Sequence, residues 1–303
     1  MAMRGDYSAC RAMSPRWLAW LGLVAVAAGL LLPVPYRYPA RWVGHVQDLA
    51  HVPAFAVVTW SLAVLMRRRA VAIAVAAIVG TAAEWFQPFV GRQASVSDWL
   101  LSLAGVGLAT VVLAETRRNV AIRAMIAVPL IGVPVAWKSP HLVDAYRFHR
   151  AFPVLAAFRS PLERSRWYLE YCRFTWRPGD IGPPYGEFTF VPGAAPSGAI
   201  LYSFHQDWSA YRHVACEFEV VDRPIRLLFS IRNAGDAIES QHFDHIATYE
   251  PGRHVVRLDL ADAASGRHAP AVNIRRIQGF YIVAEDSEHA ENRTIRVRRI
   301  EVE

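Results

Sequence analysis

The chain of 303 residues has few cysteines and lacks the short sequence motifs that are typical of common enzymes. It has three cysteines, Cys10, Cys172 and Cys216, and none of them has metal-ligand spacing such as CxxC. The motifs GxSxG, HExxH and the P-loop are absent as well. We therefore expect no cofactor and no metal, assign no catalytic residue, and favour a non-enzymatic role. Two alternatives are open for Cys172 and Cys216: a disulfide between them, or two separate buried thiols.

The C-terminal half lacks an excess of either charge. Residues 138–303 carry 21 Arg or Lys and 21 Asp or Glu, whereas residues 1–137 carry 12 and 5. The net charge of +7 therefore lies entirely beside the apolar segments of the first half. Basic residues at that place set membrane orientation, and a nucleic-acid-binding surface on the second half is not predicted.

Long apolar stretches fill the first half of the chain. Each is close to the ~20 residues that a membrane-spanning helix needs. They predict an N-terminal all-α transmembrane bundle over residues 1–137, with five helices at 17–34, 49–66, 70–86, 96–113 and 120–137. The first is expected to be an uncleaved helix rather than a signal peptide, because it is long and has no convincing cleavage site before Pro33.

The arginines between these stretches predict the orientation. Counted on alternating sides, nine lie on the side of the N-terminus and three on the other, which places the N-terminus in the cytoplasm. Five spans then put the C-terminal domain outside. The stretch 120–137 decides this, because the domain is cytoplasmic if that stretch does not span; Arg123, Pro129 and Pro134 interrupt it.

Polar residues interrupt the apolar stretches near one expected face of the bilayer. Ionisable groups at membrane depth are costly and usually functional. Helix capping by Asp48, and by Ser95 or Ser97 with Asp98 nearby, is the structural alternative, and Glu84 fits that alternative least. The candidate membrane polar cluster consists of Asp48, His51, Glu84, Gln87, Arg92 and Asp98.

These residues carry a resemblance over about residues 17–115. The pattern Asp48-x-x-His51, Glu84-x-x-Gln87, Gly91-Arg92 and Ser97-Asp98, followed by Gly105 and Gly107, resembles the VanZ-like family of small bacterial membrane proteins. Leu49 replaces the usual Lys of that family, and Ser102 the usual Asn. The resemblance implies a multi-pass protein of the bacterial cytoplasmic (inner) membrane, in cell-envelope or polysaccharide biology. The family's first member is tied to glycopeptide resistance, and no settled reaction follows from the resemblance.

The second half changes to short segments rich in β-branched and aromatic residues, separated by turn residues such as Pro251-Gly252. They predict an all-β antiparallel sandwich of jelly-roll type over residues 171–303, after a membrane-proximal linker at 138–170. The expected strands are 186–191, 199–204, 213–221, 225–233, 242–249, 254–260, 277–284 and 294–302.

A second resemblance covers about residues 186–303. Asp207-Trp208-x-x-Tyr211, Phe243 and the turn and strand from Tyr249 to Asp259 are similar in order to galactose-binding-like jelly rolls, which include carbohydrate-binding modules. The alternative for Trp208 and Tyr211 is that they fill the core. The candidate sugar-binding residues are Trp208, Tyr211, Arg232, Asp236, His242 and Tyr281.

Three functions follow as hypotheses. The first is a membrane protein that presents an exported sugar-binding sandwich, with the lipid bilayer and envelope glycans as partners and no nucleic acid. The second is an enzyme or transporter-like protein acting on a lipid-linked or peptidoglycan intermediate, in which Glu84 or His51 moves a proton and Arg92 holds a phosphate or carboxylate. The third is a membrane-anchored protein-interaction module.

Overall fold

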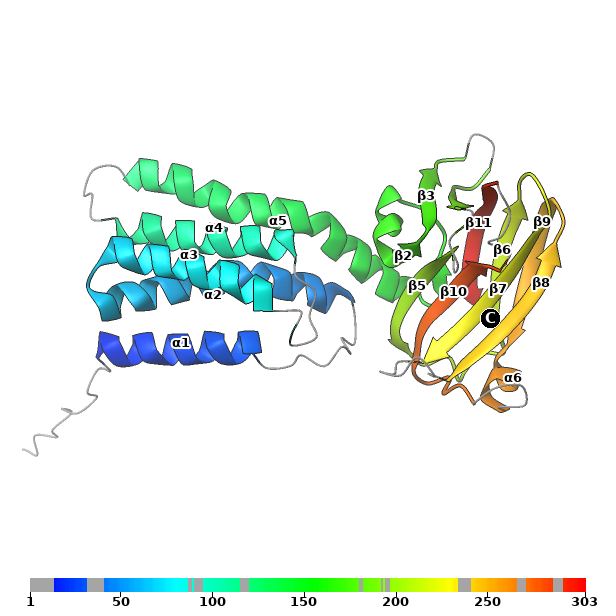
Figure 1. The fold of residues 1–303 in the computed structure, drawn as a ribbon, viewed down its shortest axis with the longest axis horizontal. Coiled ribbons are helices and arrows are strands. Elements are labelled where there is room, and N and C mark those ends of the chain that lie inside the picture. The colour runs from blue at the N-terminus through cyan, green and yellow to red at the C-terminus, as the bar shows by residue number, and fades with distance from the viewer. Residues whose placement is uncertain are drawn as a thin grey trace, which may run out of the picture. The chain divides into compact units, whose positions relative to one another are not determined.

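The computed structural model confirms the predicted fold class, an N-terminal helical region and a C-terminal pair of antiparallel sheets (Figure 1). Two compact units result, one of residues 1–34 and 45–139 and one of residues 35–44 and 140–303. The structure describes residues 14–31, 41–86, 89, 95–114, 120–179, 182–191, 193, 197–233, 241–265, 271–285 and 291–303.

Five helices form the first part of the chain: α1 (Pro15–Leu31), α2 (Arg41–Met66), α3 (Arg69–Phe86), α4 (Val96–Leu113) and α5 (Val120–Ala151). In lipid, a helix satisfies its backbone polar groups within the segment, which suits such apolar sequences. Four of the described helices, α2 to α5, are long and apolar enough to cross a membrane, and α1 is shorter at 17 residues. Large apolar side chains such as Ile78 and Met125 are exposed, as in a protein surrounded by lipid.

Small residues allow the helices to approach one another closely. A Cβ added at Gly105 of α4 would overlap the backbone oxygen of Val52 in α2. Phe55, Val58, Ala76 and Val106 form the buried apolar centre beside this contact. Glycine at such a crossing lets two helix backbones pack together, which is common in membrane bundles.

The last helix extends well beyond its predicted end. α5 runs to Ala151 and has 32 residues, so at 1.5 Å per residue it is about 48 Å long, against about 30 Å of hydrocarbon. The expected linker at 138–170 is instead structured. It holds the end of α5, β1 (Val154–Ala156), the 3-10 helix η2 (Pro161–Arg166) and β2 (Trp167–Glu170). Antiparallel pairing of β1 with β11 ties this segment to the sandwich.

Two antiparallel sheets form the sandwich. One has the order β3-β4-β11-β6-β9, with β1 also on β11, and the other the order β2-β5-β10-β7-β8. The remaining elements are β3 (Cys172–Arg177), β4 (Tyr185–Phe190), β5 (Ser197–Gln206), β6 (His213–Val220), β7 (Ile225–Asn233), β8 (His242–Tyr249), β9 (Gly252–Asp259), α6 (Leu260–Ser265), β10 (Ile277–Ala284) and β11 (Arg293–Val302). Inward side chains of both sheets meet in one core that includes Phe188, Phe218, Phe229 and Phe280.

Both described cysteines are free, buried thiols. Cys172 lies in β3 and Cys216 in β6, with β4 and β11 between these strands in the same sheet. Three strand spacings amount to about 14 Å, beyond the roughly 7 Å limit between disulfide-bonded Cα atoms. The disulfide alternative is therefore wrong. Burial raises the pKa of the Cys172 thiol to about 12.

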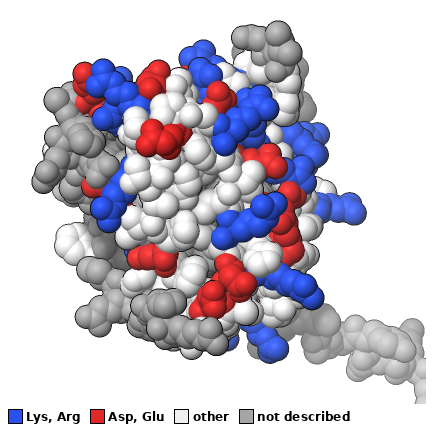
Figure 2. All heavy atoms as spheres, turned by 90° about the vertical axis from the view of Figure 1, so that its right-hand side faces the viewer, with Lys and Arg blue, Asp and Glu red and all other residues white. Residues whose placement is uncertain are grey.

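Charged side chains on the sandwich are of mixed sign. Figure 2 shows Lys and Arg interspersed with Asp and Glu over the face turned to the viewer. Neighbouring strands pair such charges, for example Arg296 with Glu187 and Arg298 with Glu219, each at 3.2 Å. This agrees with the balance of 21 basic and 21 acidic residues over 138–303.

Candidate functional site

Three ionisable side chains meet inside the helical unit. His51 comes from α2, Glu84 from α3 and Asp98 from α4, and one ligand atom of each lies within 4.8 Å of the others. Their exposed fractions are only 6%, 6% and 8%. Three separate helices thus bring together three residues of the predicted polar cluster.

The orientation of His51 follows from the hydrogen bonds of Ser102. The Ser102 hydroxyl donates its one hydrogen to the backbone oxygen of Asp98, at 2.9 Å. It can then only accept from His51 Nδ1, 3.1 Å away, so Nδ1 carries the proton. In the neutral ring, Nε2 then has the lone pair with which histidine binds a metal ion or accepts a proton.

Asp48 belongs to a separate ion pair. Its Oδ2 lies 2.8 Å from Lys138 Nζ of α5 and 3.7 Å from His45 Nδ1. The basic partner of Asp48 thus comes from another helix. Sequence reasoning missed Lys138, because 90 residues separate it from Asp48 and no local spacing links them.

The chemistry of this cluster follows from its donor set. A histidine nitrogen with two carboxylates suits a divalent ion such as Zn²⁺ or Mn²⁺, and the same groups could exchange a proton. Glu84 Oε2 also accepts from the backbone N–H of Ser95, at 3.2 Å. The other predicted members, Gln87 and Arg92, lie outside the described residues.

A second group of polar and aromatic side chains lies on the outer face of the β2-β5-β10-β7-β8 sheet. The register aligns Tyr168, Ile200, Tyr281, Ser230 and Asp244 in one row across all five strands. Since side chains alternate along a strand, the buried neighbours of Tyr281 in the sequence face the core and Tyr281 faces outward. Tyr168 is 50% exposed.

The next row places Tyr202, Gly279, Arg232 and His242 side by side. Arg232 stacks on the ring of Tyr281, 4.4 Å from its centroid, and its Nε donates to Ser230 Oγ. The ring of Tyr281 lies against Gly279, since a Cβ added there would be 3.0 Å from Tyr281 Cε2. We call the set Tyr168, Tyr202, Arg232, His242, Asp244 and Tyr281 the tyrosine face.

The electrostatics confirm that these groups are close to one another. Burial raises the pKa of Tyr202, and Tyr281, Tyr168 and Glu170 add to that effect. Burial also raises the pKa of Tyr281, which the charge of Arg232 partly offsets. His242 Nε2 lies 3.5 Å from Asp244 Oδ2. The hydroxyls of both tyrosines therefore stay protonated at neutral pH and can donate hydrogen bonds.

The other predicted sugar-binding residues do not join this face. Trp208 is fully buried and its backbone N–H donates to Ile274 O, so it fills the core and cannot contact a sugar. Tyr211 is partly buried, packs on the core and contacts Phe152 edge-on at 5.4 Å. Asp236 lies outside the described residues. Sequence reasoning missed Tyr168 and Tyr202, although the alternation around Tyr202 places it outward.

Comparison with solved structures finds sandwiches of similar fold. The Family 11 carbohydrate-binding module from Clostridium thermocellum, in complex with a β-1,3-1,4-mixed-linked tetrasaccharide, is 12% identical with a TM-score of 0.41, covering 49% of this chain and 93% of that one. The CBM22-1 xylan-binding domain of Paenibacillus barcinonensis Xyn10C is 10% identical with a TM-score of 0.34, covering 49% and 94%. The mannan-recognising module TmCBM27 is 11% identical with a TM-score of 0.30, covering 48% and 93%.

No protein-family model and no curated protein matches the chain. The VanZ-like resemblance of the helical half stays a prediction.

Proposed function

We propose that the protein is a membrane-anchored carbohydrate-binding protein, and that its sandwich binds a glycan on the tyrosine face. The observation that carries this proposal is the alignment of Tyr168 and Tyr281 in one row, with Tyr202 and Arg232 in the next. These residues come from four of the five strands of one sheet, so a rigid scaffold holds them.

The chemistry of the tyrosine face suits a sugar chain. Aromatic rings offer apolar area at low entropic cost and pack on the C–H faces of pyranose rings. Sugar hydroxyls need donors and acceptors beside those rings, which Arg232, His242 and Asp244 supply. A few convergent polar groups within an aromatic surface are the usual means by which a site fixes the orientation of its ligand.

We further propose that the sandwich is exported and acts at the bacterial cell envelope. Nine arginines on the N-terminal side of the spans against three on the other support a cytoplasmic N-terminus and an external C-terminal domain. The VanZ-like pattern around Asp48, His51 and Glu84 supports the cytoplasmic membrane of a bacterium as the location.

The test is glycan binding by the full chain in detergent micelles, measured on an array of bacterial envelope polysaccharides, β-glucans, xylans and mannans. The variant Tyr281→Ala is expected to weaken binding about tenfold, equivalent to about 1.4 kcal/mol, as for loss of one aromatic contact. Tyr185→Ala is the matched control, because Tyr185 lies on the other sheet beside Arg296. Equal loss in both variants, or no binding across the array, rejects the proposal. Specific capture of a protein without glycan binding would favour the interaction module.

The cluster of His51, Glu84 and Asp98 favours a second candidate function. Their convergence and the lone pair on His51 Nε2 suit proton transfer or metal-assisted chemistry on a lipid-linked or peptidoglycan intermediate. The test is complementation of a deletion strain by Glu84→Gln. Full complementation at wild-type abundance rejects this candidate, whereas loss of function with retained sugar binding supports it.

A further inference from the structure

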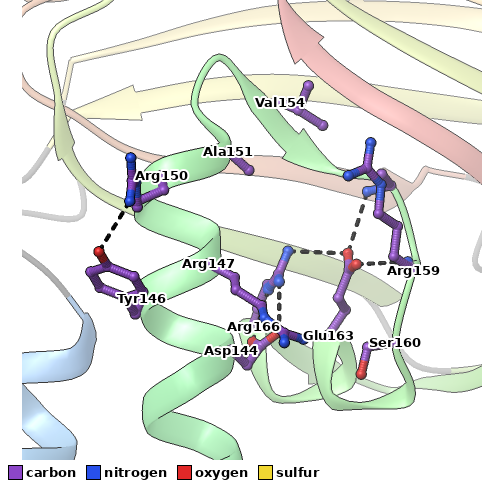
Figure 3. Close-up of a pocket in the computed structure, with 11 residues that line it drawn as sticks. Asp144, Tyr146, Arg147, Arg150, Ala151, Val154, Arg159, Ser160, Glu163 and Arg166 are labelled. Atoms are coloured by element: carbon purple, nitrogen blue, oxygen red, sulfur yellow. Dashed lines mark hydrogen bonds and ion pairs between the residues drawn. The ribbon is translucent and has the colours of Figure 1, made fainter.

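A cavity of about 520 Å³ lies within the C-terminal unit, where α5 meets β1 and η2. Its volume is within the roughly 300–1,000 Å³ that is typical of small-molecule sites. It is separate from the tyrosine face, and its lining is strongly charged. We call it the α5 pocket (Figure 3); Asp144, Arg147, Arg150, Arg159, Glu163 and Arg166 supply its charged side chains.

The floor of the α5 pocket is a closed network of buried charges. Arg166 donates to both oxygens of Asp144, at 2.6 and 3.0 Å, and lies 3.1 Å from Glu163 Oε2. Glu163 also accepts from the backbone N–H groups of Ala157, Phe158 and Arg159. The exposed fractions of Asp144, Glu163 and Arg166 are 5%, 3% and 8%. Both carboxylates therefore have their donors within the protein.

The mouth of the pocket carries arginines that take no part in the ion pairs of the floor. Arg147 and Arg159 are exposed, and Figure 3 places them on opposite sides of the Arg166–Glu163 pair. Within the described part of the chain, neither guanidinium group has a hydrogen bond or an ion pair. Arg150, also exposed, donates only to the hydroxyl of Tyr146, at 3.3 Å. Several guanidinium donors are thus available to an external acceptor.

The charge balance favours an anion. Four arginines and two carboxylates line the pocket, so its net charge is +2. The C-terminus of α5 adds about half a negative charge, which the excess of two positive charges outweighs. Guanidinium groups match the oxygens of a phosphate in pairs, which makes phosphate the anion that this lining suits best.

The position along α5 indicates where that phosphate comes from. The apolar stretch ends at Trp137 and Lys138, and Asp144 and Arg147 lie about 10–15 Å further along the helix axis. The polar headgroup layer begins where the hydrocarbon ends and adds about 5–8 Å on each side of a bilayer, so these two residues lie just beyond it, within reach of long arginine side chains. Measured along α5 alone, a lipid headgroup is therefore the nearest source of phosphate, and free inorganic phosphate is the other source that the test distinguishes.

We propose that the α5 pocket binds the phosphate headgroup of an anionic membrane phospholipid. This goes beyond the proposed sugar binding and is independent of it, because it uses none of the residues of the tyrosine face. A lipid held between α5 and η2 would contact the first turns of the chain that leave the membrane.

The test uses the full chain in a neutral detergent, with lipid binding measured by native mass spectrometry. Phosphatidylglycerol is the probe, phosphatidylcholine the neutral comparison and inorganic phosphate the soluble competitor. The double variant Arg147→Gln/Arg159→Gln is expected to bind phosphatidylglycerol about 25-fold more weakly, from about fivefold for each basic residue near an anionic headgroup. Both side chains are exposed, so the thermal midpoint should not change.

The matched control is Arg173→Gln/Arg253→Gln, which removes two exposed arginines outside the pocket and should change binding less than twofold. Arg147→Lys/Arg159→Lys keeps the charge and should lose less than the Gln pair. Equal losses in the pocket and control variants would mean unspecific attraction and overturn the proposal. So would equal binding of phosphatidylcholine, or displacement of the lipid by inorganic phosphate at equal concentration.

Discussion

Substituting Arg166 tests the buried network beneath the α5 pocket. Arg166→Met keeps most of the apolar stem and removes the guanidinium group, whose carbon lies 4.9 Å from the centre of the Phe148 ring. Asp144 loses both hydrogen bonds while staying 5% exposed. Glu163 keeps its three backbone donors. The main consequence is one uncompensated carboxylate in a buried position.

Breaking a buried pair from one side costs about 3–5 kcal/mol. For a domain of this size, each kcal/mol lowers the thermal midpoint by about 2–4 °C, so the expected decrease is about 6–20 °C. The assay is thermal unfolding of the full chain in detergent, followed by far-UV circular dichroism at a wavelength where the β-sheets of the sandwich contribute. The double variant Asp144→Leu/Arg166→Met should recover part of the loss, because it removes the stranded charge.

The control is Arg177→Met. Arg177 pairs with Glu187 at 3.2 Å but is 51% exposed, so its loss should cost at most about 1 kcal/mol. A decrease in Arg166→Met no larger than in this control would refute the argument that the network is desolvated. If the double variant is as unstable as Arg166→Met, the unpaired charge of Asp144 is not the cause of the lost stability.

Two further predictions concern helix packing and alkaline stability. Gly105→Val should force α2 and α4 apart and cost about 1–3 kcal/mol or more, whereas Gly132→Val, with nothing within 4 Å, should be tolerated; equal effects on detergent stability would contradict this. Burial raises the pKa of Cys172 and of Tyr249 each to about 12. The folded state therefore keeps protons that the unfolded state loses from about pH 9, so stability is full below that pH and falls as pH rises toward 12. Denaturant unfolding should show this decrease, and Cys172→Ala should reduce it; an unchanged alkaline profile in that variant would exclude a role for the thiol.

Much of the fold could be predicted from the sequence. The alternation in β9 and β11 and the turn residues between strands identified eight strands, because half-buried strands show a period of two. β2 and β3 were missed: β2 has only four residues, whereas the six residues of β3 do alternate between inward apolar and outward polar side chains, a signal that could have identified it. The end of α5 was missed because it leaves the apolar environment and continues as a polar helix.

The candidate sites could be predicted only in part. His51, Glu84 and Asp98 stood out because ionisable groups are rare in apolar segments, and they do converge. Lys138 and the network around Arg166 depend on pairings between distant segments, which local spacing does not reveal. Trp208 is a different case, because an aromatic residue before a strand can either fill the core or bind a ligand. Its complete burial shows that it fills the core.

The position of β11 has a consequence for how the protein is made. This strand, Arg293–Val302, lies between β4 and β6 in the middle of its sheet and also pairs with β1. The backbone oxygen of Glu303 accepts from Arg212 and His213. β11 also follows all the other strands in the sequence, so this sheet closes only after the strands on both sides of β11 have been made. Without β11, the pairs β3-β4 and β6-β9 would have no strand to join them into one sheet.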